Sequence, residues 1–199
     1  NLRVGHFIQD AEPISRLTNI EFLDISDSKI DDLSPLYGLH NLKSLNVRNT
    51  EVSDLTPLSN LKNLKELNIE NTNVKSLQAL HELSNISKIY ADGSKLTQDE
   101  VVALKRKQRQ LTVIYQTDDL RLWWGNLDMA WREIFNSHLT CNSNPTAEQL
   151  QSIVDLEEIV VDPNNVVYSL ESLQQMSFLR KLIINNNQIH DLTPLSDKD

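Results

Sequence analysis

The chain contains one thiol that could act as a nucleophile, Cys141. A catalytic cysteine needs a base within hydrogen-bond reach and a third group that orients the base. The only nearby candidate base is His138, and the surrounding segment is rich in Ser and Asn. Because no third group accompanies this pair, the pattern favours a structural or incidental cysteine over a nucleophile. A single cysteine also excludes a disulfide within the chain.

The other titratable side chains form no recognisable metal or acid–base site. His81-Glu82 lacks the second histidine of a zinc motif, and no H-x-x-x-H pair occurs. The neighbouring carboxylates Asp31-Asp32 and Glu157-Glu158 should point apart in strands or turns. No D-x-D-x-D-G spacing supports calcium. We therefore expect no catalytic residue, metal or cofactor, and a chain that is not an enzyme. The histidines are His6, His40, His81, His138 and His190.

The one basic run, Lys105 to Arg109, could contact phosphate or an acidic partner. It also lies at the C-terminal end of a predicted helix, where the helix dipole favours positive charge. The whole chain has a formal net charge of −9 and a pI near 5.0. This acidity disfavours binding to a phosphate backbone. The pattern favours a helix end, and no nucleic-acid partner is expected.

Three tryptophans, Trp123, Trp124 and Trp131, could form a platform on which a sugar ring stacks. Tryptophans at helical spacing are more often part of an apolar core. Leu127, Trp131, Ile134 and Phe135 fall at i, i+4, i+7 and i+8, which predicts one buried helix face. Core packing is the favoured interpretation, and the sugar platform is the alternative.

The elements that position these residues follow a repeat between Leu42 and Asn85. Two segments read L-K-S-L-N-V-R-N-T-E-V-S-D-L-T-P-L-S-N-L-K-N and L-K-E-L-N-I-E-N-T-N-V-K-S-L-Q-A-L-H-E-L-S-N. Equivalent residues are 22 positions apart (64 − 42), and a fixed period of this size indicates a solenoid. Apolar and polar residues alternate at the start of each segment, as in a strand with one buried face. Thr50 and Thr72, at the ninth position, can bond the backbone of the following turn.

These segments resemble leucine-rich repeats (LRRs), most of all the 22-residue repeats of internalin-type bacterial surface proteins. The shared features are the apolar ladder, the D-L-x-P-L return leg and the closing Asn. The resemblance implies an α/β solenoid, in which a right-handed superhelix carries a parallel sheet on its concave face. It also implies a protein-binding role without catalytic residues. The family's asparagine at the ninth position is a hydroxyl residue in most repeats here: Ser28, Thr50, Thr72 and Ser94, with Asn only at Asn187.

A chain of 199 residues can form one long domain or two short ones. Its 39% apolar content fits a soluble globular chain, and no run reaches the roughly 18 apolar residues of a membrane span. We expect a first LRR block at 1–116, a helical cap or linker at 117–155, and a second LRR block at 156–199 that is incomplete at its C-terminus. The helices should cap the start of the second block.

The repeat also predicts local structure. Strands are expected near 22–25, 44–47, 66–69, 88–91 and 112–115, and a further pair near 158–161 and 181–184. The segment from Leu2 to His6 fits the strand pattern poorly. A capping box at Thr97 to Glu100 predicts a helical return leg. Asn126 is expected to cap a helix that ends near His138, and Thr146 with Gln149 is expected to cap another.

The outward strand positions should form columns on the concave face, because stacked coils place equivalent residues about 4.8 Å apart. Aromatic and arginine side chains are enriched among interface anchors. We therefore expect Phe22, Arg48, Glu70 and Tyr90 to contact a protein partner. The alternative is a face that only confers solubility, with Phe22 partly covered by the incomplete first repeat. The expected columns are Phe22, Ser44, Glu66, Lys88; Asp24, Asn46, Asn68, Tyr90; and Ser26, Arg48, Glu70, Asp92.

The predicted function is a protein-binding solenoid, secreted or on a bacterial surface. The alternative is an intracellular scaffold, or an accessory region trimmed from a larger protein, with or without an enzymatic domain. A signal peptide or lipoprotein cysteine ahead of Asn1 would distinguish these readings. The last repeat stops shortly after Leu195 without a cap. This predicts either self-association through that end or further repeats in the gene.

Overall fold

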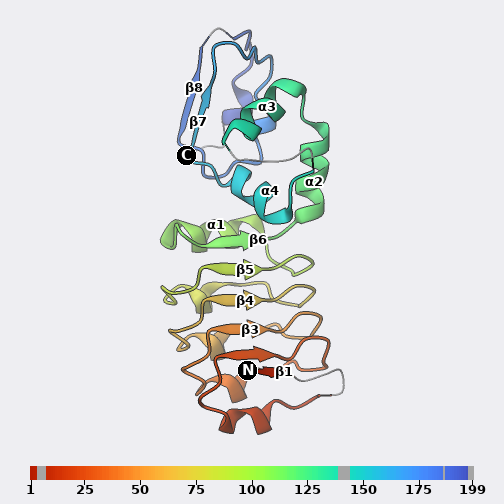
Figure 1. Ribbon diagram of the computed structural model, residues 1–199, viewed down its shortest axis with the longest axis vertical. Helices are drawn as coiled ribbons and strands as arrows, with labels where there is room; N and C mark the ends of the chain where they lie inside the picture. Colours follow the sequence, from red (N-terminus) through yellow and green to blue (C-terminus); the bar gives the residue numbers. More distant parts are fainter. Residues whose placement is uncertain (4–7, 139–143, 186, 197–199) are drawn as a thin grey trace. The chain divides into compact units, whose positions relative to one another are not determined.

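Each coil of the repeat begins with a short strand, because apolar and polar side chains alternate there. The computed structural model describes residues 1–3, 8–138, 144–185 and 187–196, and its strands form two sheets. The first sheet holds six parallel strands in chain order (Figure 1), and the second holds two. The first contains β1 (Leu2–Arg3), β2 (Phe22–Asp24), β3 (Ser44–Asn46), β4 (Glu66–Asn68), β5 (Lys88–Tyr90) and β6 (Thr112–Ile114); the second contains β7 (Glu158–Val161) and β8 (Lys181–Ile184).

The strand positions and parallel pairing predicted from the repeat are confirmed. Equivalent residues pair across neighbouring strands, so that Leu23, Leu45 and Leu67 are register partners. One strand was not predicted: β1 pairs with β2, although its sequence fits the repeat poorly. The rest of that poorly fitting segment lies outside the described residues. The sheet therefore begins one coil earlier than the apolar pattern indicates.

The chain divides into two compact units, residues 1–116 and 117–199. In the first unit the core is one continuous cluster of Leu, Ile and Val side chains from every coil. Leu67 of β4 is fully buried at its centre. One coil of 22 residues buries these side chains only against its neighbours, and alone it has too small a core to offset the entropy lost on ordering its backbone. The coils are therefore stable because they stack.

The return leg of most coils contains a short 3₁₀ helix. Proline lies in its first turn in four coils, where its fixed φ suits the helix and its missing N–H costs nothing. Aspartates two residues ahead accept the first N–H: Asp32 from Ser34, Asp54 from Thr56 and Asp191 from Thr193. The 3₁₀ helices are η1 (Glu12–Arg16), η2 (Ser34–Leu36), η3 (Thr56–Leu58), η4 (Gln78–Leu80), η5 (Glu171–Leu173) and η6 (Thr193–Leu195).

The fifth coil returns through an α-helix instead, α1 (Gln98–Lys107). As predicted, the Thr97 side chain caps it by accepting the N–H of Glu100. In a complete capping box the Glu100 side chain would also accept the backbone N–H of Thr97, but here it accepts a different N–H. The Glu100 carboxylate accepts the N–H of Leu77, one coil earlier, at 3.0 Å. Its oxygen therefore satisfies a backbone donor of the neighbouring coil and ties the two coils together.

The ninth-position hydroxyls bond the backbone of the turn, as the repeat predicts. Ser28, Thr50 and Thr72 are buried and donate to the carbonyls of the residues three positions earlier at 2.6–2.7 Å. Each hydroxyl satisfies a carbonyl that the turn would otherwise bury without a partner.

A second ladder lies one position earlier and was missed. Asp27, Asn49, Asn71 and Gly93 all have positive φ, between 53° and 70°. Asn49 donates from Nδ2 to Asp27 Oδ1 at 2.6 Å, and Asn71 donates to Asn49 Oδ1 at 2.7 Å. Asp, Asn and Gly are the residues that best tolerate this backbone conformation. Hydroxyl residues do replace asparagine at the ninth position. A separate ladder of amide and carboxylate side chains at the eighth position was not expected.

The second unit packs three helices and the β7–β8 sheet around one core. The helices are α2 (Thr117–Asn126), α3 (Met129–His138) and α4 (Ala147–Val154). The prediction that Asn126 caps the helix ending near His138 is wrong. Asn126 ends α2, and Asp128 Oδ1 accepts the N–H of Trp131 at the start of α3 at 2.8 Å. The capping box of Thr146 and Gln149 at the start of α4 is complete, as predicted.

Candidate functional site

The outward side chains of β1–β6 and of the residues just after them form the surface that we call the sheet face. Strand register places Phe22 beside Ser44, and Tyr90 three strands further along the sheet than Asp24. Two of the three expected columns are therefore present within the strands: the one that starts at Phe22 and the one that starts at Asp24. Arg48 and Glu70 follow β3 and β4 and contact each other. Phe22 and Tyr90 lie apart, on β2 and β5.

One end of the sheet face is a closed network of polar contacts. Asp24 is 7% exposed. Its Oδ1 accepts both the N–H and the hydroxyl of Ser26, at 3.1 and 2.7 Å. Its Oδ2 lies 3.3 Å from Nε of Arg3. The charge of this nearly buried carboxylate is therefore compensated by hydrogen bonds and by one cation.

The middle of the sheet face holds Arg48 and Glu70, two of the predicted contact residues, which form an ion pair. Its closest N–O distance is 3.7 Å, and the two side chains are 50% and 22% exposed. Glu70 is fixed by Asn68, whose Oδ1 accepts the Glu70 N–H and whose Nδ2 donates to Glu70 Oε2, both at 2.9 Å. Because its distance exceeds that of a hydrogen bond, the arginine contact is the loosest in this group.

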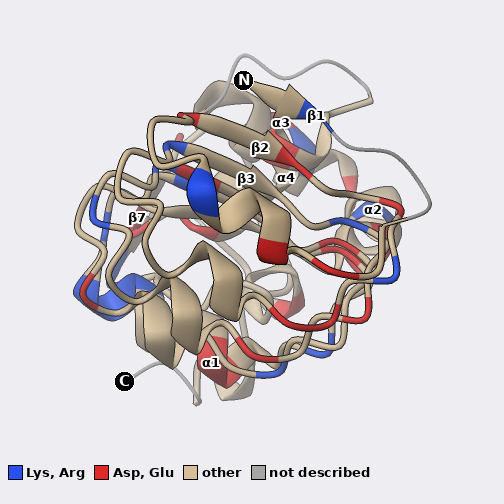
Figure 2. Ribbon diagram, turned by 90° about the horizontal axis from the view of Figure 1, so that it is seen from below, with Lys and Arg blue, Asp and Glu red and all other residues tan. Residues whose placement is uncertain are grey.

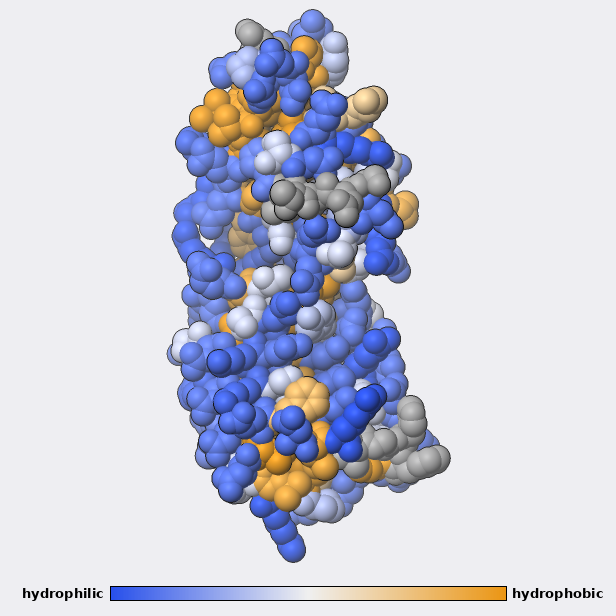
Figure 3. Space-filling view, viewed as in Figure 1, coloured by the Kyte–Doolittle hydropathy of each residue, from blue (hydrophilic) through white to orange (hydrophobic). Residues whose placement is uncertain are grey.

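The two predicted aromatic anchors differ in exposure. Phe22 is 37% exposed, and Figure 3 shows hydrophobic surface gathered over the first coils of the first unit. Tyr90 is half-buried, and Nζ of Lys88 lies 5.7 Å from its ring centroid. Phe22 therefore offers the more open apolar surface, and Tyr90 presents a ring already in contact with a cation.

Charges of both signs are intermixed along the ribbon (Figure 2). At the edge of the sheet, Lys43 donates to Glu21 at 2.7 Å. This hydrogen bond, and then the charge of Lys43, hold the pKa of Glu21 below its ordinary value. Pairs of this kind join neighbouring coils and leave no block of a single sign at this edge.

The tryptophans belong to the core of the second unit and form no open platform. Trp131 is fully buried and stacks on Phe135, with ring centroids 5.4 Å apart. Its indole N–H donates to the carbonyl of Ser169, and that of Trp123 donates to Ser172. These bonds tie the helices to the first coil of the second block and leave no ring arranged for a sugar.

The other chemically distinctive residues show no catalytic arrangement in the part of the chain that the structure describes. His138 Nδ1 lies 2.8 Å from the carbonyl oxygen of Ile134, within its own helix. Cys141 lies outside the described residues, so the structure says nothing of its surroundings. Over residues 1–3, 8–138, 144–185 and 187–196, no three His, Cys, Asp or Glu side chains cluster as metal ligands. Lys105, in the basic run, is buried at the end of α1.

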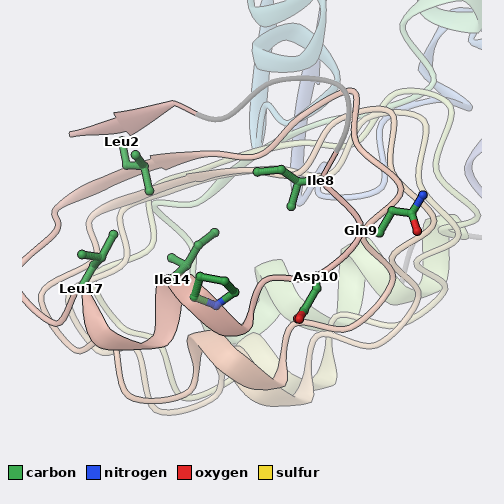
Figure 4. Close-up of a pocket in the computed structure, with 7 residues that line it drawn as sticks. Leu2, Ile8, Gln9, Asp10, Ile14 and Leu17 are labelled. Carbon is green, nitrogen blue, oxygen red and sulfur yellow. The ribbon is translucent and has the colours of Figure 1, made fainter.

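The structure adds a hollow that the repeat did not predict. A cavity of about 540 Å³ opens at the first coil, between β1 and η1 (Figure 4). Its one acidic side chain, Asp10, accepts the N–H of Glu12 at 2.8 Å. The remaining lining is mainly apolar and supplies no group for catalysis. The cavity is lined by Leu2, Ile8, Gln9, Asp10, Pro13, Ile14 and Leu17.

The stacked coils and their parallel sheet define an LRR solenoid of the α/β class. Residues 40–82 match the family model described as Leucine Rich repeats (2 copies). LRRs are generally non-catalytic modules that mediate protein–protein interaction.

Solved structures show the same fold at low sequence identity. Internalin C2 of Listeria monocytogenes is 18% identical, with a TM-score of 0.50 over 96% of this chain and 63% of that one. A second internalin of that species is 23% identical, with a TM-score of 0.50 over 95% and 48%. An LRR protein of Leptospira interrogans is 20% identical, with a TM-score of 0.52 over 56% and 30%. This chain thus spans less than two thirds of each of these structures.

No curated protein matches the sequence. Among the described residues, no helix has the length and apolar character needed to cross a membrane.

Proposed function

We propose that this chain binds a protein partner through the sheet face of residues 1–116. The observation that carries the proposal is Phe22, an aromatic ring that is 37% exposed on the sheet face. Arg48, Glu70 and Tyr90 complete the proposed contact set. Exposed aromatic and arginine side chains are the types that most often anchor interfaces. None of the four belongs to the buried core, so each is available to a partner.

We also propose that the protein acts outside the cell or on the surface of a bacterium. The support is the resemblance of its 22-residue repeats to those of internalin-type proteins. The alternative is an intracellular scaffold or an accessory region of a larger protein. The encoded sequence ahead of Asn1 discriminates between the two, because a signal peptide or a lipoprotein cysteine there favours the surface role.

The proposed organisation of the second unit is a helical cap, 117–155, on a second LRR block, 156–199. The shared core supports it: Trp131 and Phe135 of α3 are buried in one cluster with Ile159 and Val161 of β7. A cap covers the apolar end of a solenoid that would otherwise meet water. At the other end of this unit, we propose self-association through the last coil, whose Leu192 is 66% exposed.

The binding proposal is tested by replacing the four contact residues together with alanine. The chain is used as bait against surface and secreted proteins of the source organism. Loss of a captured protein with an unchanged melting temperature is the expected result. The matched control replaces Lys29, Glu51, Asn73 and Lys95, which form an exposed column at the same 22-residue spacing. Equal capture by both quadruple variants would place the contact outside the sheet face, and would not favour the Trp123–Trp124 region because Trp124 is buried.

A further inference from the structure

Hydrogen-bond donors without an acceptor gather at β3 on the sheet face. Asn46 Oδ1 accepts the N–H of Arg48 at 3.0 Å, which fixes the amide and leaves its Nδ2 group facing away from that bond. Within the described part of the chain, this Nδ2 group has no acceptor. The equivalent group of Asn68, one strand further, donates to Glu70. Asn46 is half-buried, and its Nδ2 group is not among the buried polar atoms without a partner. It is therefore open to solvent and can donate to a ligand that supplies an oxygen.

The guanidinium of Arg48 adds further donors beside this amide. It has five N–H groups, and its closest acceptor, Glu70 Oε2, lies 3.7 Å away. The Glu70 carboxylate also accepts from Asn68 Nδ2 at 2.9 Å, and its contact with the arginine is an ion pair longer than a hydrogen bond. Asn46 and Arg48 therefore present an amide and a cation side by side, a combination that suits a carboxylate.

The exposed ring of Phe22 is the apolar surface nearest in register to these donors. Phe22 pairs in register with Ser44, whose small side chain leaves the neighbouring side of the ring open. Arg48 is four residues beyond Ser44, which corresponds to about 13 Å along an extended chain. The exposed carboxylate of Glu66 is the register partner of Ser44. It disfavours a second acid close to Phe22.

We propose that the sheet face binds an extended acidic segment of its protein partner. An apolar side chain of that segment lies on Phe22, and a carboxylate three or four residues away accepts from Asn46 Nδ2 and Arg48. This inference rests on the proposed protein-binding function and names the chemistry of the partner. Electrostatic complementarity of this kind decides which partner binds more than how tightly it binds.

Asn46→Asp is the most informative variant. Asp24, in the preceding coil, uses a carboxylate oxygen to accept the N–H two residues on, as Asn46 uses its amide oxygen. Asn46→Asp should therefore keep the local fold while it removes the donor and adds a repelling charge. Asn73→Asp is the matched control, because it adds the same charge at an exposed position outside the sheet face.

The experiment displays a random twelve-residue peptide library against the full chain. The expected binders carry an apolar residue and an Asp or Glu three to four positions apart. They should lose at least about tenfold in affinity on Asn46→Asp or Arg48→Ala and keep it on Asn73→Asp. A second selection on Arg48→Glu should enrich Lys or Arg in place of the acid.

Each other outcome overturns a distinct claim. Binders that depend on Phe22 and Arg48 but carry no acid overturn the acidic partner and leave the sheet face as a binding surface. Binders insensitive to every sheet-face variant overturn both proposals. A library that yields no binder to the wild-type chain overturns the acidic segment, and the capture experiment on whole proteins still tests the sheet face.

Discussion

Position eight of each coil shows how one backbone conformation selects residue types. The chain turns there with positive φ, and Asp27, Asn49, Asn71 and Gly93 occupy that position in four successive coils. The first three also form a chain of side-chain hydrogen bonds. At the fourth, a Cβ on Gly93 would lie 2.1 Å from Oδ1 of Asn71. The backbone there favours Gly, Asn or Asp, and a Cβ at Gly93 also requires the Asn71 side chain to shift.

Gly93→Ala is expected to destabilise the chain by about 1–3 kcal/mol, because it adds backbone strain and a clash. Asn71→Gly keeps the positive φ and removes the amide. In the double variant, the loss caused by Gly93→Ala should be smaller than in the wild type. Urea unfolding of the four chains gives this coupling energy. Strict additivity would show that Asn71 does not contribute to the constraint on Gly93.

Leu67 tests the register of the repeat at its centre. Its side chain is fully buried between Leu45 and Ile89. Leu67→Ala should lower the free energy of unfolding by about 2–5 kcal/mol, as truncations in a packed core do. Glu66→Ala, on the exposed face of the same strand, is the control and should change it by less than about 0.5 kcal/mol. A loss for Leu67→Ala no larger than for the control would mean that the register is wrong.

At the scale of elements, the sequence predicted what is periodic. A strand opens each coil and a buried hydroxyl follows it, because both recur every 22 residues. The helices have no such repeat, so their ends had to be predicted from local capping residues, which are less reliable. Asn126 resembled a cap because it precedes an apolar helix face, yet it is the last residue of α2, and Asp128 caps α3. Several residue types can cap a helix, so sequence alone did not choose between them.

The periodic part of the sheet face was likewise predictable from the sequence, and its side-chain contacts were not. Its columns followed from the period, so Phe22, Arg48, Glu70 and Tyr90 could be placed on one surface. The hydrogen bonds among them could not, since they depend on rotamers. No spacing rule predicts that Asn68 donates to Glu70, or that the Nδ2 group of Asn46 lacks an acceptor among the described residues while its Oδ1 is bonded. The role of the four residues in binding stays a prediction.

The starts of the 3₁₀ helices make stability depend on pH. The Ser34, Thr56 and Thr193 hydroxyls, followed by the backbone N–H groups of the same residues, hold the pKa values of Asp32, Asp54 and Asp191 below the ordinary value. A carboxylate whose pKa is lowered on folding stabilises the fold above its unfolded pKa, about 3.9 for Asp. That contribution disappears as the pH falls through the lowered, folded-state pKa.

The triple variant Asp32→Asn, Asp54→Asn and Asp191→Asn checks this dependence. Asparagine still accepts the N–H but does not titrate, so the variant should melt below the wild type at pH 7. The difference in melting temperature should shrink as the pH is lowered through 4 toward about 2.5. A difference that stays constant with pH would show that these carboxylates contribute nothing through ionisation.

At the scale of the whole chain, its last described coil exposes apolar side chains that the preceding coil buries. Leu170 is 1% exposed, whereas Leu192, 22 residues later, is 66% exposed. Leu173 is fully buried and Leu195 only partly. β8 is also the edge strand of its sheet. An apolar edge with unpaired backbone groups is a template for association.

The 199-residue chain is therefore expected to self-associate through β8 and η6. Light scattering over a rising concentration series should show an increasing mean mass. Leu192→Lys should reduce that increase, because it places a charge in the apolar edge. Leu122→Lys is the matched control, since Leu122 is 64% exposed but lies on α2. If the wild-type chain stays monomeric at every concentration, the open edge does not drive association. If both lysine variants reduce the mass equally, the contact lies away from the last coil.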